Sequence, residues 1–244
     1  MTFERIKEII KFDSKLEEDS FNFYIKMKGI AIHENIIKYL GYDLSSKYTK
    51  VTWSKVSVHL RYDKKLRDTI YIYLATLEEY IRAFIGNKYE DDIENFNLCQ
   101  TSDTKMISNR IDKGEKISKI LQSISFGSLI KLVKNMNSKD INEMFNNVIN
   151  LSQNLDAVVV LRNAVSHHVF LLDNSFKECY VNDVCSNSLE NNIKNLRQLL
   201  PEEYRYGING KGGITSDIEK CKFEIINNKN VLLDINTNNI INMN

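Results

Sequence analysis

Proline occurs once among the 244 residues, at Pro201, and this scarcity constrains the fold more than any other feature of the sequence. Proline removes a backbone N–H and clashes with the preceding helical turn, so a chain that avoids it can form long helices. Apolar residues also recur at steps of three and four over most of the first 200 residues, as on the buried face of an amphipathic helix. We therefore expect an all-α bundle of six or more helices.

The clearest helix is predicted in YDKKLRDTIYIYLATLEEYIRAFIGNKY, residues 62–89. Asp63 is its expected N-cap and Gly86 can end it. Lys64, Lys65 and Arg67 could contact RNA, and a solvated helix start explains them as well. Further helices are expected in four runs: residues 116–136 with a break near Gly127, residues 138–155 from Ser138, residues 156–172 from Asp156, and residues 185–204 up to Pro201.

The domain organisation follows from where this periodicity stops. Residues 1–200 are predicted to form one helical domain, with N-terminal helices in 1–50 and the core in 51–200. Residues 201–244 are predicted to form a small C-terminal extension, in which KFEIINNKNVLLDI (222–235) is expected as a short β-hairpin. We expect strand chiefly in this extension.

Charge and cysteine usage limit the class of protein. The formal net charge of +1 gives no global signal for nucleic acid, and no apolar run approaches the ~18 residues that span a membrane. The N-terminus is too charged for a signal peptide, and the four cysteines lack a C-x-x-C spacing. We expect a cytoplasmic protein with free thiols and no membrane partner.

One region is locally basic. Residues 102–139 hold eight Lys or Arg and three Asp or Glu, an excess of 8 − 3 = 5 positive charges. A solvated helical face is the simpler interpretation, and a surface that follows the phosphates of a nucleic acid is the alternative.

The stretch VVVLRNAVSHHVFLL, residues 158–172, places charged and titratable residues inside an apolar run. On a helix at about 100° per residue, an apolar stripe runs from Val158 to Leu172 with His168 at its edge. Arg162, Asn163 and His167 share the opposite, polar face. A rigid helix that presents these three side chains together is suited to hold reacting groups.

This spacing alone is a weak signal, and other interpretations stay open. His168 can be a hydrogen-bonded structural histidine that borders the core. A zinc site is less expected, because adjacent histidines diverge on a helix and C-x5-C is not a usual pair of ligands. Its ligands would be His167, His168, Cys179 and Cys185.

The same stretch carries a family resemblance. LRNAVSHH resembles the Arg-x4-His signature of the HEPN nucleases, and residues 62–85 are similar to the FD-x-x-LR…E-x-x-IR helix of the Abi-like family, the AbiD/AbiF group of phage abortive-infection proteins. ISFGSLIKLV and KMKGIAIHENIIKYLGYDLSSKY resemble the mid-chain and N-terminal parts of that family. The resemblance covers about residues 20 to 200.

The resemblance implies an HEPN-type bundle that cleaves RNA without a metal or other cofactor, as a homodimer with two Arg-x4-His motifs across a two-fold axis. It also implies a phage-defence or toxin–antitoxin system in which a cognate non-coding RNA restrains or guides the protein. The residues it assigns are catalytic Arg162, Asn163 and His167, with Glu78 and Arg82 as possible supporting residues. His168 is a further possible supporting residue. From the basic region of residues 102–139, Lys113, Lys116 and Lys119 are the candidates for RNA binding.

The chemistry fits these residue types. RNA carries its own nucleophile in the ribose 2′-hydroxyl, an imidazole exchanges protons near neutral pH, and a guanidinium stays charged on a phosphate. Two alternatives use the same residues without catalysis. One is an RNA-binding protein in which Arg162 and His167 clamp a phosphate, and the other is a helical adaptor in which they hold a dimer together.

Overall fold

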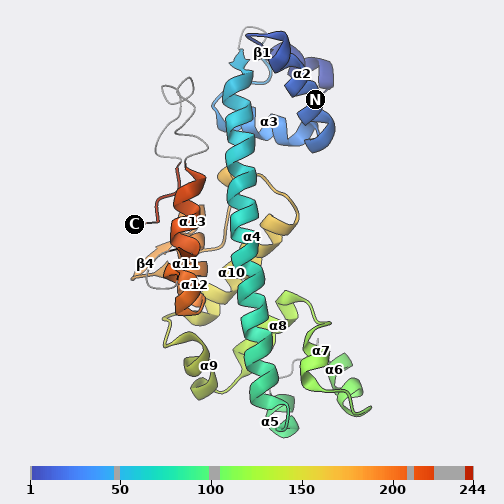
Figure 1. Cartoon of the computed structure of the whole chain (residues 1–244), viewed down its shortest axis with the longest axis vertical. Coiled ribbons are helices and arrows are strands. Elements are labelled where there is room, and N and C mark those ends of the chain that lie inside the picture. The colour runs from blue at the N-terminus through green and yellow to red at the C-terminus, as the bar shows by residue number, and fades with distance from the viewer. Residues whose placement is uncertain (1, 47–49, 99–104, 208–211, 223–239, 244) are drawn as a thin grey trace. The chain divides into compact units, whose positions relative to one another are not determined.

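The computed structural model describes residues 2–46, 50–98, 105–207, 212–222 and 240–243 (Figure 1). Within these residues the chain forms thirteen α-helices, one short 3-10 helix and two pairs of short strands. The expected all-α fold is therefore confirmed. The chain divides into two compact units, and the long helices α4 (Trp53–Tyr89) and α10 (Leu151–Ser166) contribute residues to both.

The first unit comprises residues 1–70, 164–175 and 215–244. Its sheet is a parallel pair, in which Ile10 of β1 lies opposite Val51 of β2. Besides the first part of α4, its elements are α1 (Phe3–Ile9), β1 (Ile10–Lys11), α2 (Lys15–Lys28), α3 (Ile30–Tyr39), β2 (Val51–Thr52), the 3-10 helix η2 (Leu171–Asp173) and most of α13 (Gly213–Cys221).

Aromatic packing closes the core of the first unit. Phe21 on α2 is fully buried, and its ring lies 5.7 Å from that of Phe3 and 5.5 Å from that of Trp53, the first residue of α4. Ser14 caps α2 by accepting the Glu17 backbone N–H at 3.2 Å. The cap fixes where α2 begins, and the buried aromatic side chains hold α2 against α4.

The second unit comprises residues 71–163 and 176–214. Its strands pair antiparallel, with Tyr180 opposite Cys185. Besides the remainder of α4 and most of α10, its elements are α5 (Ile93–Leu98), α6 (Lys105–Ile111), α7 (Ile117–Leu121), α8 (Phe126–Asn135), α9 (Ser138–Phe145), β3 (Cys179–Val181), β4 (Val184–Ser186), α11 (Leu189–Leu199) and α12 (Glu202–Tyr206).

Several helix boundaries differ from those predicted. Helix α4 begins at Trp53, so Asp63 is not its N-cap but a buried residue within it. Residues 116–136 form two helices, and the break precedes Gly127 because Ser125 caps α8. Residues 138–155 do not form one helix: α9 ends at Phe145, and three asparagines with positive φ separate it from α10. Those residues are Asn146, Asn147 and Asn150.

Helix α10 ends at Ser166, and the expected continuation to residue 172 is wrong. His168 adopts a φ of 55° and donates its backbone N–H to the Val165 carbonyl, while Val169 donates to the Ala164 carbonyl. This pair of bonds is the Schellman arrangement, in which a residue in the left-handed region stops the helix. The histidine pair therefore lies at a helix end and not within a helix.

The strands also differ in place. The two described pairs both precede Pro201, whereas strand was expected chiefly after it. Apart from its first residue, the predicted hairpin of 222–235 lies outside the described residues. Helix α11 ends at Leu199, just before Pro201, as predicted. In the described part of the chain, no helix combines the length and the apolar character needed to cross a membrane.

Candidate functional site

The Arg-x4-His motif lies at the C-terminal end of α10. Arg162 is half-buried and Asn163 is exposed, and both belong to the second unit. His167 follows the last helical residue, is exposed, and belongs to the first unit together with His168. All three predicted catalytic residues therefore have side chains that solvent can reach within their own units.

From a helix continued through residue 172, we expected His168 to border the core. This expectation is wrong. The residue is exposed, because the backbone turns into the left-handed region where α10 stops. Histidine is one of the few side chains besides glycine that is enriched at such a φ. His167 and His168 therefore leave the backbone in different directions, and only the first continues from the helix.

A buried ion pair on α4 contacts this turn. Arg67 is 5% exposed and donates from Nη2 to Oδ2 of Asp63, which is 1% exposed. The other oxygen of Asp63 accepts the backbone N–H of Leu171 at 2.6 Å. Nη1 of Arg67 lies 3.5 Å from Nδ1 of His168. Asp63 therefore fixes Arg67 on one side and the chain after α10 on the other.

The contact with Arg67 determines which ring nitrogen of neutral His168 carries the proton. A guanidinium has only donors, so Nδ1 of His168 must be the acceptor of the contact with Arg67. In the neutral ring the proton then lies on Nε2. The Nε2–H of His168 is thus a donor that the contact with Arg67 leaves unused.

Burial dominates the electrostatics of Asp63. Loss of solvent is the largest effect and raises the pKa of its carboxyl to about 6. The Arg67 guanidinium, the Leu171 N–H and the Lys28 ammonium favour the charged form and so lower the pKa, but they do not outweigh burial. A carboxyl with a pKa near 6 titrates in the range where acid–base groups of enzymes operate. Asp63 does not face solvent, so its effect on the site passes through Arg67.

A pocket of about 560 Å³ adjoins Arg67 within the first unit. Two of its walls come from the end of α2 and the start of α3, and the third comes from the turn after α10. The pocket combines cationic groups with apolar ones. It is lined by Met27, Lys28, Ala31, Ile32, Asn35, Arg67, His168, Val169 and Phe170.

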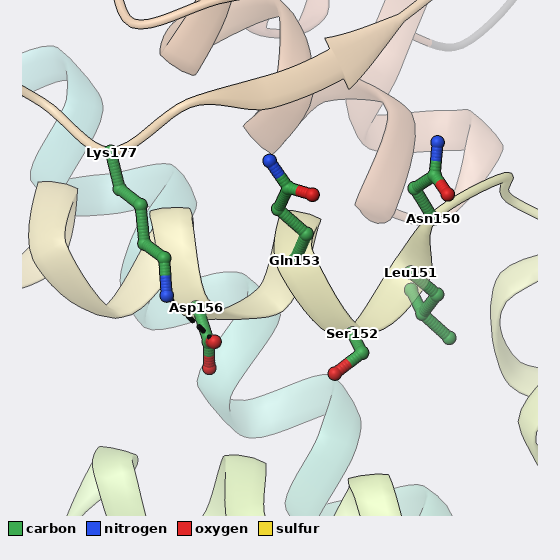
Figure 2. Close-up of a pocket in the computed structure, with 6 residues that line it drawn as sticks. All are labelled: Asn150, Leu151, Ser152, Gln153, Asp156 and Lys177. Atoms are coloured by element: carbon green, nitrogen blue, oxygen red, sulfur yellow. Dashed lines mark hydrogen bonds and ion pairs between the residues drawn. The ribbon is translucent and has the colours of Figure 1, made fainter.

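The second unit has a shallower pocket at the N-terminal end of α10 (Figure 2). Lys177 extends to Asp156 at 2.8 Å, and Gln153 donates to the Glu178 carbonyl at 3.3 Å, while Ser152 points the other way. Burial alone would raise the pKa of Asp156, but Lys134 and Lys177 hold it below its usual value. The two charged residues that line this pocket therefore pair with each other.

Glu78 and Arg82, the predicted supporting pair, lie on α4 in the second unit. Arg82 forms an ion pair with Glu78 and donates from Nη2 to the carbonyl of Ile124 at 2.9 Å. These contacts connect α4 to the turn between α7 and α8. Support of the Arg-x4-His helix by this pair stays a prediction.

The three predicted RNA-binding lysines are exposed. Lys113 lies in the turn after α6, Lys116 precedes α7 as its N-cap, and Lys119 lies within α7. Between them, Glu115 is bound by Arg110 through two hydrogen bonds of 3.0 and 2.6 Å. The acidic residue is thus neutralised locally, which leaves the lysine charges to face solvent.

The described residues hold no group of three or more His, Cys, Asp or Glu side chains that could bind a metal ion.

The sequence predicts Asp63 only as a helix cap and leaves Arg67 open between an RNA contact and a solvated helix start, so it misses the buried pair that the two residues form. Their i, i+4 spacing in YDKKLR was visible, but an exposed start of a helix explained both residues equally well. The signal that would have distinguished the two explanations lies upstream. Trp53, Val56 and Leu60 continue the three-and-four apolar spacing toward the N-terminus, which puts Asp63 within the helix.

Comparison with known proteins gives one match. A family model described as "Abi-like protein" matches residues 1–173, which include the pocket of the first unit and the whole Arg-x4-His motif. No curated protein and no solved structure matches the chain.

Proposed function

Because the chain belongs to the Abi-like protein family, we propose that it is a metal-independent endoribonuclease of the HEPN type. The resemblance noted in the sequence is thereby confirmed at the level of the Abi-like family. Membership suggests a part in abortive infection, a defence against phage. RNA cleavage would serve such a defence by stopping translation in an infected cell.

The proposed reaction uses the 2′-hydroxyl of RNA as nucleophile. His167 removes the 2′-hydroxyl proton, the oxygen attacks the adjacent phosphorus, and the bond from phosphorus to the 5′-oxygen breaks. The products are a 2′,3′-cyclic phosphate and a 5′-hydroxyl, whose oxygen receives a proton. Arg162 stabilises the charge on the phosphate, and Asn163 orients the reacting groups by hydrogen bonding.

The observation that carries the proposal is the Arg-x4-His spacing at the exposed end of α10 in a chain of this family. Exposure of Asn163 and His167 supports it, since an RNA strand has to reach both side chains. The Schellman turn supports it as well, because hydrogen bonds of 3.3 and 3.1 Å fix the backbone directly after His167. A fixed backbone limits the loss of rotational freedom when substrate binds.

A homodimer completes the proposed mechanism. One imidazole cannot easily act as base and acid in the same step, so we propose that two copies bring two motifs together across a two-fold axis. RNA is the proposed partner, both as substrate and as a cognate non-coding RNA. The exposed Lys113, Lys116 and Lys119 are proposed to contact its phosphates.

The test is cleavage of a labelled RNA in the presence of EDTA, with the product ends mapped. We expect wild type to produce 2′,3′-cyclic phosphate ends. His167→Ala should lower the single-turnover rate constant by about 10²- to 10⁴-fold, as for loss of a general acid–base group. His168→Asn is the matched variant, because asparagine tolerates the left-handed backbone there, and its rate constant at saturating RNA should stay within about tenfold of wild type.

Several outcomes would contradict the proposal in different ways. Full activity of His167→Ala, or an absolute need for metal, would reject the mechanism. Tight RNA binding without cleavage by wild type would favour the non-catalytic phosphate clamp. Absence of both RNA binding and cleavage would leave the dimerising adaptor, and light scattering that shows a monomer with and without RNA would reject the dimer.

A further inference from the structure

We propose that the pocket of the first unit binds one nucleotide of an RNA strand, with its phosphate held by Arg67, Lys28 and His168. The RNA in this statement rests on the proposed function, whereas the phosphate chemistry rests on the pocket alone. The pocket adjoins His168, the residue directly after His167, but shares none of the three proposed catalytic residues.

Arg67 provides the main argument. Its Nη2 donates to Asp63 and its Nη1 contacts His168, but its buried Nε–H has no hydrogen-bond partner in the described structure. A buried donor without a partner is costly and calls for an explanation. Because Arg67 lines the pocket, its guanidinium can attract a phosphate there and form a charge-assisted hydrogen bond with it.

Lys28 adds positive charge around the same space, and His168 adds a hydrogen-bond donor. Lys28 is exposed at the end of α2 and lies close enough to Asp63 to favour its charged form. His168 contributes the Nε2–H donor that its contact with Arg67 leaves unused. The single buried carboxylate of Asp63 pairs with Arg67 and so offsets only part of this charge.

The start of α3 also supports an anion site in this pocket. This ten-residue helix begins after Gly29 without a side-chain cap, and Ala31 and Ile32 of its first turn line the pocket. The first backbone N–H groups of a helix have no partners within it and attract anions. Arg67 and the start of α3 thus both adjoin the pocket, and each can attract an anion.

The remaining lining argues for a nucleotide and not a bare anion. Met27, Val169 and Phe170 are apolar, and Met27 is 66% exposed, so a ligand can reach this side chain. A volume of about 560 Å³ lies in the range of small-molecule sites. The cationic side can take the phosphate, and the apolar side can take the ribose and base.

The RNA arm of the test uses the full chain carrying His167→Ala, so that the RNA stays intact. Binding of a fluorescein-labelled 10-nucleotide RNA is measured by anisotropy at fixed salt. Lys28→Glu should weaken binding by about tenfold, because it turns an attractive charge into a repulsive one at the phosphate. Lys26→Glu is the matched control: Lys26 is exposed on the same helix but does not line the pocket, and its variant should bind within about twofold of the parent.

The phosphate arm does not depend on RNA or on activity. The full chain is titrated with inorganic phosphate, and separately with 5′-AMP, while the arginine Nε–Hε signals are followed by ¹H–¹⁵N spectroscopy. The signal lost in Arg67→Lys identifies Arg67. It should move on titration, and Arg82, whose guanidinium pairs with Glu78, should not follow it. AMP should saturate at lower concentration than phosphate, since it also covers the apolar wall.

The two arms separate the two proposals. Equal weakening by Lys28→Glu and Lys26→Glu would overturn the pocket as an RNA subsite even if RNA is cleaved. An Arg67 signal that ignores both phosphate and AMP would overturn the phosphate site. A moving Arg67 signal in a chain that binds no RNA would support a phosphate site and reject the RNA function, with free nucleotide as the occupant.

Discussion

Asp63 is the residue at which burial and ion pairing oppose each other, and its titration can be measured. Asp63→Asn keeps the shape of the side chain but removes the ionisation. The carboxyl has a pKa of about 6 in the folded protein and an ordinary value of 3.8, a difference of about two pH units. Each pH unit corresponds to about 1.4 kcal/mol, so ionisation of Asp63 should cost the folded protein about 3 kcal/mol.

The sign follows from the direction of the change. Because the folded-state pKa is raised, the contribution of Asp63 to stability is fully present below pH 4 and is lost as the pH rises through 6. The free energy of unfolding of wild type, relative to that of Asp63→Asn, should therefore fall by about 3 kcal/mol between pH 4 and pH 7. The fall should be steepest between pH 3.8 and about pH 6, which are the ordinary and the folded-state pKa values of Asp63.

The assay is urea unfolding at several pH values and constant ionic strength, followed by the fluorescence of Trp53. This residue is the single tryptophan and is buried in the first unit, so it reports on the unit that contains Asp63. Asp68→Asn, an exposed site on the same helix, corrects for loss of one negative charge. A wild-type advantage that grows with pH would refute the reasoning, since it would mean that Arg67 outweighs burial and depresses the pKa of Asp63.

The other predictions concern the turn after α10, the basic surface and the start of α13. His168→Gly should raise the free energy of unfolding by about 1 kcal/mol, because glycine has no penalty at a φ of 55°; a loss of stability in thermal unfolding would contradict this. Changing Lys113, Lys116 and Lys119 together to Glu should weaken RNA binding and flatten its salt dependence, and unchanged affinity would place the RNA surface elsewhere. Gly213→Ala should destabilise by at least about 2 kcal/mol, because its Cβ would lie 2.7 Å from three backbone atoms of the preceding turn; an unchanged melting temperature would count against the geometry.

The fold class could be predicted because it depends on patterns that the sequence displays over long stretches. Scarce proline and three-and-four apolar spacing require many helices whatever their exact ends. The boundaries depend on single residues. Asn146 and Asn150 interrupt what looks like one helix because asparagine tolerates positive φ, yet the same residue type also occurs inside helices such as α11.

The end of α10 shows the same limit at the candidate site. Glycine usually marks the left-handed residue that closes a helix, and here a histidine occupies that position. The apolar residues after it, Phe170 and Leu171, continue the helical spacing of α10 although they lie beyond its end. Periodicity therefore predicts a helix through the histidines with His168 at the edge of the apolar stripe, whereas the backbone turns there and exposes it.

The contact between Arg67 and His168 could not be predicted, because it joins residues that are 101 positions apart. Local spacing predicts the Asp63–Arg67 pair, but only the folded chain shows that the pair is buried and that its partner is the turn after α10. The roles that we propose for the two adjacent histidines differ accordingly. His167 has the solvent exposure that a proton-transferring group needs, whereas His168 contacts a buried arginine and keeps one donor for a ligand. Neighbouring residues at a helix end can thus have separate proposed roles in chemistry and in binding, because only one of them contacts the buried ion pair.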